Sequence, residues 1–213
     1  MVLSPQQMRW SGWLLFIGAL LSILVLLTDF IFSAPLVLTA SVSLLGGLLV
    51  VAGLPGTYLK QRNFIGILGS VGFLILWITL LVTTLGVNIE EIVIAATTAH
   101  PSAQSVPPVI VNILNLTDLL MLIGTLIYGV LTIRAHIFSA SIGWLLVATV
   151  ATMTLALFMG GALSSLLYIV GELLIQIGFA RLGYALARWE DDDDIEPERV
   201  TSEEIITTGD LQQ

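Results

Sequence analysis

Long runs of apolar residues, separated by short polar segments, occupy most of the first 188 residues of the chain. A helix needs about 20 predominantly apolar residues to cross the ~30 Å hydrocarbon core of a bilayer. Six runs meet this requirement, and we predict transmembrane helices at residues 13–32, 36–54, 64–85, 109–133, 142–159 and 163–187. The expected fold is therefore an all-α, polytopic six-helix transmembrane bundle formed by residues 1–188.

Proline, glycine and polar residues set the predicted ends of these helices. Pro55-Gly56 is expected to end the second helix, and Gly160-Gly161 to form a tight turn between the last two. The longest loop begins near Gly86, and Asn88 is an N-cap candidate there, so we predict a short surface helix over residues 88–99. The first run is too long for the core of a cleaved signal peptide and is expected to remain as a helix.

The positive charges predict an orientation for this bundle. All Lys and Arg residues fall in segments that six crossings place on one side: Arg9, Lys60, Arg62, Arg134, Arg181, Arg188 and Arg199. Cytoplasmic loops carry an excess of such residues, so we predict that both termini are cytoplasmic. Tryptophans near the same boundary, Trp10, Trp13, Trp144 and Trp189, agree with this depth, because indole rings favour the headgroup layer. Trp77 lies within a predicted span instead.

Composition supports lipid as the solvent of the folded part. Hydrophobic residues make up 57% of the chain and charged residues 10%, against roughly 25% charged residues in soluble domains. The net charge is −8, but ten of the fifteen acidic residues follow Trp189. Residues 189–213 are thus predicted to be a disordered cytoplasmic tail, with docking of a protein partner as the alternative. Membrane lipids are the other expected partner, and nucleic acid is not.

Three acidic residues lie within predicted spans and are the candidates for chemistry. Asp118 and Glu172 are expected near mid-membrane, each about nine residues from the outer end of its helix, and Asp29 near the outer boundary. An intramembrane carboxylate is costly, so it must face the bundle interior, be paired or be protonated. No Lys or Arg is predicted at that depth.

Polar neighbours indicate which helix faces point inward. Tyr168, Glu172 and Gln176 follow a spacing of four and form one stripe, preceded by Ser165. A second row is predicted on the helix of residues 109–133, where Asn112, Asn115 and Asp118 follow one another at a spacing of three. A polar seam from the outer surface to mid-membrane is the expected result.

Two interpretations of this seam remain open, and an enzyme is a third. The seam is either a structural hydrogen-bond network in a non-enzymatic integral membrane protein, or a proton or cation site of a small transporter. A membrane enzyme acting on lipid would use the inner basic patch of Lys60, Arg62, Arg134 and His136, but the positive-inside bias already explains that patch. No catalytic residue, cofactor or metal site is predicted, and the absence of cysteine excludes thiolate chemistry.

Several short motifs resemble those of small bacterial six-helix membrane proteins of unknown function. They are Gly53–Gln61 followed by Gly66, Gly69, Gly72 and Phe73, then Tyr128–Ala135, and Gly183–Leu186 before Arg188. The chain departs from the pattern at Phe138–Ser141, where a Pro-Arg-Trp-like turn is expected. The resemblance implies residence in a bacterial cytoplasmic membrane and a six-helix architecture, and it carries no functional residues.

Overall fold

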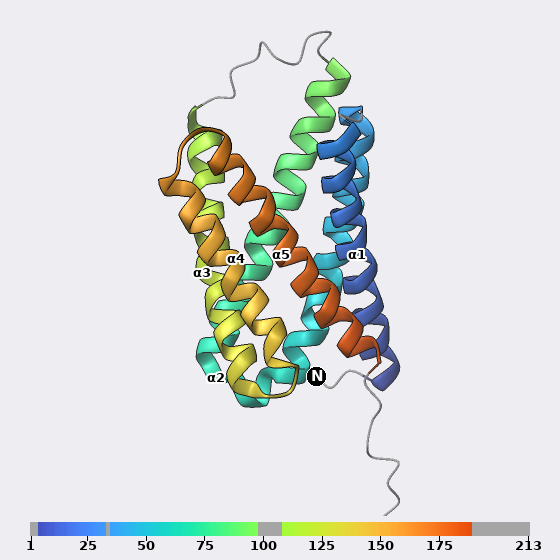
Figure 1. The fold of residues 1–213 in the computed structure, drawn as a ribbon. Coiled ribbons are helices and arrows are strands. Elements are labelled where there is room, and N and C mark those ends of the chain that lie inside the picture. The colour runs from blue at the N-terminus through green and yellow to red at the C-terminus, as the bar shows by residue number, and fades with distance from the viewer. Residues whose placement is uncertain (1–3, 33–34, 98–107, 189–213) are drawn as a thin grey trace, which may run out of the picture.

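The protein is an all-α bundle. The computed structural model describes residues 4–32, 35–97 and 108–188, and these form five helices. The helices are α1 (Pro5–Phe32), α2 (Leu36–Thr97), α3 (Pro108–Ala135), α4 (Ala140–Phe158) and α5 (Gly161–Ala187). They pack lengthwise, with α5 crossing the bundle between α1 and α4 (Figure 1). All five are long and apolar enough to cross a membrane, so the all-α membrane class is confirmed, whereas the described residues contain five helices instead of the predicted six.

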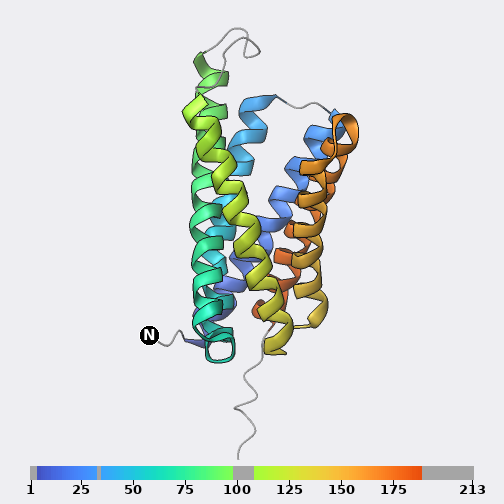
Figure 2. The same ribbon diagram turned by 90° about the vertical axis from the view of Figure 1, so that its left-hand side faces the viewer.

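The difference in number arises in α2, which reverses direction at Gly66, the one residue with non-helical φ and ψ in this element. Gly66 has φ 60° and ψ −161°, a conformation that is open essentially to glycine alone. The residues before it and after it form two arms that run back along each other (Figure 2). Contacts step in opposite directions along the two arms: Tyr58 with Ser70, Val51 with Trp77, and Gly47 with Thr84.

The predicted break at Pro55-Gly56 is wrong, because α2 continues through Pro55. Proline lacks the N–H that would bond to the carbonyl of the residue four positions earlier, which is Val51. The indole N–H of Trp77, on the second arm, donates to that Val51 oxygen at 2.8 Å. A side chain from the neighbouring arm therefore compensates the missing helical bond, as membrane helices containing proline require.

The predicted end of the third helix at residue 85 is also wrong. The second arm of α2 continues to Thr97, so residues 88–97 prolong a long helix and do not start a short surface helix. Asn88 is buried inside this helix and its amide Nδ2 donates to the Thr84 carbonyl at 2.8 Å. It is therefore not an N-cap.

At the N-terminus, α1 begins eight residues earlier than predicted. The backbone N–H of Gln7 donates to Ser4 Oγ at 3.2 Å, and the Ser4 N–H donates to Gln7 Oε1 at 2.9 Å. This reciprocal pair is a capping box, and Pro5 occupies the first helical position, where its missing N–H costs nothing. Ser4-Pro5-Gln6-Gln7 was thus a readable start signal.

Close approach of the helices depends on small residues at their crossings. A Cβ added to Gly18 of α1 would lie 2.7 Å from the Gly46 carbonyl oxygen of α2, so α1 tolerates no larger side chain at that position. Such small-residue contacts are the usual basis of helix packing in lipid. The predicted turn between α4 and α5 is present, and Gly161 adopts a positive φ of 64° in it.

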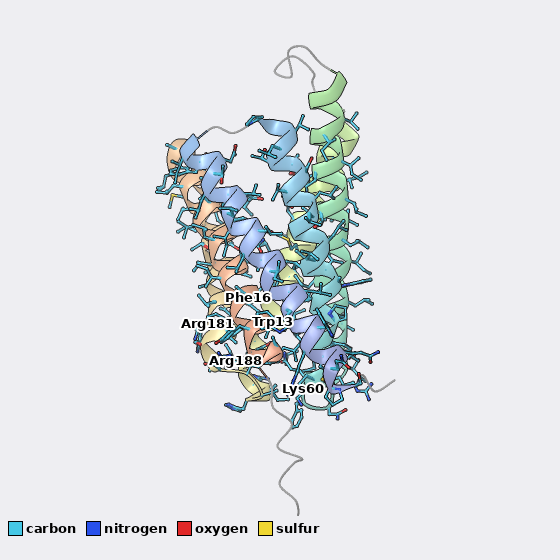
Figure 3. The ribbon with its side chains drawn as sticks, turned by 90° about the vertical axis from the view of Figure 1, so that its right-hand side faces the viewer. Trp13, Phe16, Lys60, Arg181 and Arg188 are labelled. Atoms are coloured by element: carbon cyan, nitrogen blue, oxygen red, sulfur yellow. The ribbon has the colours of Figure 1, made fainter. Side chains whose placement is uncertain are left out.

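Basic residues gather at one end of the bundle. Lys60, Arg181 and Arg188 lie together at the end where α1 starts and α5 finishes, close to Trp13 (Figure 3). Trp10 and Trp144 are exposed, as expected for boundary residues. The predicted tail, with Trp189 and Arg199, and loop residues 98–107 lie outside the described part of the chain.

Candidate functional site

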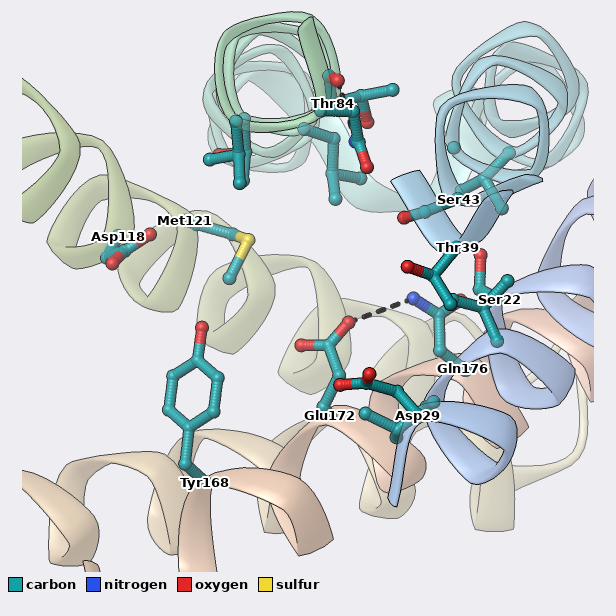
Figure 4. A pocket seen from close by; sticks show the side chains of 18 residues that line it. Ser22, Asp29, Thr39, Ser43, Thr84, Asp118, Met121, Tyr168, Glu172 and Gln176 are labelled. Atoms are coloured by element: carbon teal, nitrogen blue, oxygen red, sulfur yellow. Dashed lines mark hydrogen bonds between the residues drawn. The ribbon is translucent and has the colours of Figure 1, made fainter. Parts of the chain in front are cut away.

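A cavity of about 380 Å³ lies in the half of the bundle away from the basic end. It is bounded by α1, by both arms of α2, by α3 and by α5. Asp29 of α1, Asp118 of α3 and Glu172 of α5 all line it (Figure 4). Three acidic residues that are far apart in the sequence therefore face one space.

The predicted polar stripe of α5 faces this cavity. Tyr168, Glu172 and Gln176 line it together, and the Tyr168 hydroxyl points into the space between α5 and α3 (Figure 4). Asp118 lies ten residues into α3 and Glu172 eleven residues into α5, counted from Pro108 and Gly161. At about 1.5 Å per residue, these positions give the two acids nearly equal depths.

The other predicted row does not reach the cavity. Asn112 and Asn115 are exposed and are absent from the described lining, and Ser165 is exposed as well. Three residues of α-helix rotate the side chain by about 300°, so each step of three moves 60° off the starting face. Asn112 is thereby turned about 120° away from Asp118. A spacing of three, repeated, predicts a drifting row and not a stripe.

Sequence reasoning missed the polar contribution of α2. Thr39 and Ser43 of the first arm line the cavity, as do Thr84 and Asn88 of the second arm. Each pair is spaced by four residues, which was the available signal. Asn88 was predicted to be a cap, because the helix before it was expected to end at residue 85.

Glu172 and Gln176 are joined by a hydrogen bond between their side chains in the cavity lining. The Gln176 amide Nε2 donates to Glu172 Oε1 at 3.1 Å. The Gln176 Oε1 atom is buried and lacks a hydrogen-bond partner among the described residues.

No positive side chain offsets the acids. The eighteen described lining residues include no Lys, Arg or His. Within residues 4–32, 35–97 and 108–188, no group of three or more His, Asp or Glu is arranged to hold a metal ion. The cavity therefore has a negative character without the geometry of a metal centre.

Tightly packed residues close the cavity toward the basic end. Leu54, Leu76 and Phe179 are fully buried there. Beyond them, Tyr128 of α3 forms a hydrogen-bonded chain with the first arm of α2. Gln61 Nε2 donates to Tyr128 Oη at 3.1 Å, and the Tyr128 hydroxyl meets Thr57 Oγ1 at 2.7 Å. Since Thr57 Oγ1 also donates to the Leu54 carbonyl at 2.7 Å, the Tyr128 hydroxyl is the donor to Thr57.

Comparison of the chain with protein-family models, with curated proteins and with solved structures found no match. The chemistry of the cavity itself is thus the basis for assigning a function.

Proposed function

We propose that this protein is a small membrane carrier that binds a cation in the acidic cavity and moves it, alone or coupled to protons, across the membrane. The cavity brings three carboxyl groups together and offers no basic residue to neutralise them. Intramembrane acids without a basic partner bind cations or exchange protons. The carrier role is the transport alternative among the functions that the sequence left open.

One observation favours transport over a structural network. If the acids served to hold helices together, they would hydrogen-bond to neighbouring helices. Among the described residues, Glu172 accepts only from Gln176 of its own helix, and no hydrogen bond joins Asp29 or Asp118 to another side chain. Bonds between helical segments occur elsewhere, at Ser11 with Gly53, at Thr57 with Tyr128 and at Trp77 with Val51. The three acids line the cavity and form no hydrogen bond to a side chain of another helix among the described residues.

The proposed topology has six crossings. Each arm of α2 is long enough to cross the bilayer at about 1.5 Å per residue, so this one helix contributes two crossings. With an even number of crossings, the basic end of the bundle holds both ends of the helical region. We place that end in the cytoplasm by the positive-inside rule, and the resemblance noted above favours a bacterial cytoplasmic membrane.

In this orientation the cavity belongs to the outer half of the membrane. Among its lining residues Asp29 and Tyr168 are exposed, whereas Asn88, Thr84 and Gln176 are buried. The packed layer of Leu54, Leu76 and Phe179 separates it from the cytoplasmic end. This arrangement suits the outward-open conformation of a carrier, because transport sites lie near the midplane and open alternately to the two faces.

Transport is tested by reconstituting the protein in proteoliposomes and measuring proton and cation flux. Asp118→Asn and Glu172→Gln are expected to abolish flux while the proteins remain folded. Asn115→Ala, on the same helix as Asp118 but exposed and outside the cavity, is the matched control and is expected to transport normally. Absence of flux in the wild-type protein, together with lost stability in both acid variants, would instead support the structural network.

A further inference from the structure

We propose that the preferred ligand of the acidic cavity is a small organic ammonium ion that carries N–H groups and a short apolar body. This inference rests on the proposed cation carrier and names the class of cation. It depends on the size of the cavity, on its apolar walls and on the unpaired oxygen of Gln176.

Size and geometry argue against a bare metal ion. Ca²⁺ requires six to eight oxygen ligands at roughly 2.3–2.6 Å, and smaller ions require a tighter shell. The acids of the described residues are not grouped in that way. A volume of about 380 Å³ falls instead within the roughly 300–1,000 Å³ of small-molecule sites.

The walls of the cavity combine charge with apolar surface. Val25 and Leu26 of α1, Val50 and Leu80 of α2, and Met121 of α3 contribute the apolar part. A fully hydrated inorganic ion would gain nothing from these side chains. A short alkyl group attached to a cationic nitrogen would bury its carbons against them while the nitrogen approached a carboxylate.

Gln176 distinguishes among organic cations. Its side chain lines the cavity, is only 9% exposed, and leaves Oε1 without a partner while Nε2 is held by Glu172 (Figure 4). A buried acceptor of this kind is costly unless a donor reaches it. A primary ammonium supplies one N–H to the Glu172 carboxylate and, once the amide turns its buried Oε1 toward the cavity, another to Gln176. A quaternary ammonium has no N–H to offer.

The aromatic content of the cavity agrees with this choice. Quaternary ammonium ions are recognised by cages of several aromatic rings. Tyr168 is the single aromatic residue among the eighteen described lining residues. Recognition must therefore depend on carboxylates and on the amide, which favours a cation that donates hydrogen bonds.

The test uses the purified full chain and four probes that differ in charge, in N–H groups and in apolar body: n-butylammonium, tetramethylammonium, n-butanol and Na⁺. Calorimetric titration should give the tightest binding for n-butylammonium. Gln176→Met, which replaces the amide by an apolar chain of similar length, should weaken that binding about tenfold, the usual effect of losing a hydrogen bond to a charged group. The same substitution should leave tetramethylammonium unchanged, and Thr152→Val on α4, outside the cavity lining, should alter neither probe.

The outcomes separate the ligand class from the carrier function. Tetramethylammonium or Na⁺ binding as tightly as n-butylammonium overturns the ammonium assignment, as does unchanged selectivity in the Gln176→Met protein. If that variant fails to fold, the ranking of the four probes on the wild-type protein decides the question. Cation flux without n-butylammonium binding leaves the carrier standing and removes this ligand class, whereas absence of both removes the two proposals together.

Discussion

The indole N–H of Trp77 donates to the carbonyl oxygen of Val51, which is the helical acceptor that Pro55 leaves without a donor. One hydrogen bond thus allows α2 to pass through a proline and also ties its two arms together. The first arm carries Thr39 and Ser43 into the cavity, and the second carries Thr84 and Asn88. The relative position of these polar groups depends on this contact between the arms.

A double-mutant cycle measures that dependence. Trp77→Phe should lower the free energy of unfolding by about 1–3 kcal/mol, beyond any loss of packing, because the Val51 oxygen is left unpaired. In a Pro55→Ala background the backbone N–H at position 55 can bond to Val51, so Trp77→Phe should cost clearly less. Reversible denaturation in mixed micelles gives the four energies, and strictly additive effects would refute the pairing.

Gly66, at the reversal of α2, and Gly86, on its second arm, form a matched pair. A Cβ would meet nothing within 4 Å at either position, but only Gly66 has a positive φ. We expect Gly66→Ala to destabilise the protein by about 1–3 kcal/mol, through backbone strain alone. Gly86→Ala should stabilise it by about 0.5–1 kcal/mol, because alanine is the better helix former. Equal effects on the unfolding free energy would mean that Gly66 is not the point of reversal.

Tyr128 joins α3 to the first arm of α2 below the cavity. Tyr128→Phe should cost about 1–3 kcal/mol of unfolding free energy, because the buried Gln61 amide loses its acceptor and Thr57 loses a donor. Tyr184→Phe on α5 is the control, since its ring is partly exposed and contacts Arg188 without needing the hydroxyl. The difference in unfolding free energy between the two variants measures the contribution of the hydrogen bonds among Gln61, Tyr128 and Thr57. Equal unfolding free energies would argue against that contribution.

The proposed topology is open to a direct check, because the chain has no cysteine of its own. Asn63→Cys lies just before the reversal of α2, at the basic end of the bundle, and Ala162→Cys lies at the start of α5; both positions are exposed. A membrane-impermeant maleimide applied to intact cells should label the cysteine at 162 and spare the one at 63. Inverted membrane vesicles should give the opposite pattern. Labelling of both from one side would exclude six crossings.

Helix positions were predicted well where apolar runs end at glycine pairs or charged segments, as at the α4–α5 turn. Prediction failed where tertiary contacts override a local signal. Pro55-Gly56 is a strong break in isolation, and the hydrogen bond that neutralises it comes from Trp77, which lies 22 residues beyond Pro55. Asn88 is a second case in which a local signal misleads. It resembles an N-cap in the sequence, but the helix continues past it and its amide bonds to the Thr84 carbonyl.

The candidate site was partly readable from the sequence. A spacing of four placed Tyr168, Glu172 and Gln176 on one face of α5, and that face lines the cavity. The row of Asn112 and Asn115 failed because a spacing of three rotates off the face of Asp118. The four-residue spacing of Thr39 and Ser43 places them on one face of α2, but it does not show that this face lines the same cavity as α5.

The central claim is that the cavity admits cations, and Ser43 with Ser41 allows the most direct measurement of it. Ser43 lines the cavity, whereas Ser41 is exposed on the same helix outside the lining. Each is replaced by cysteine, and the modification rates with a trimethylammonium and a sulfonate methanethiosulfonate are compared. We predict that Ser43→Cys reacts at least about tenfold faster with the cationic reagent, as expected for an acidic cleft, and that Ser41→Cys shows no such preference. Equal rates at Ser43→Cys, or no reaction from either side of the membrane, would contradict the account.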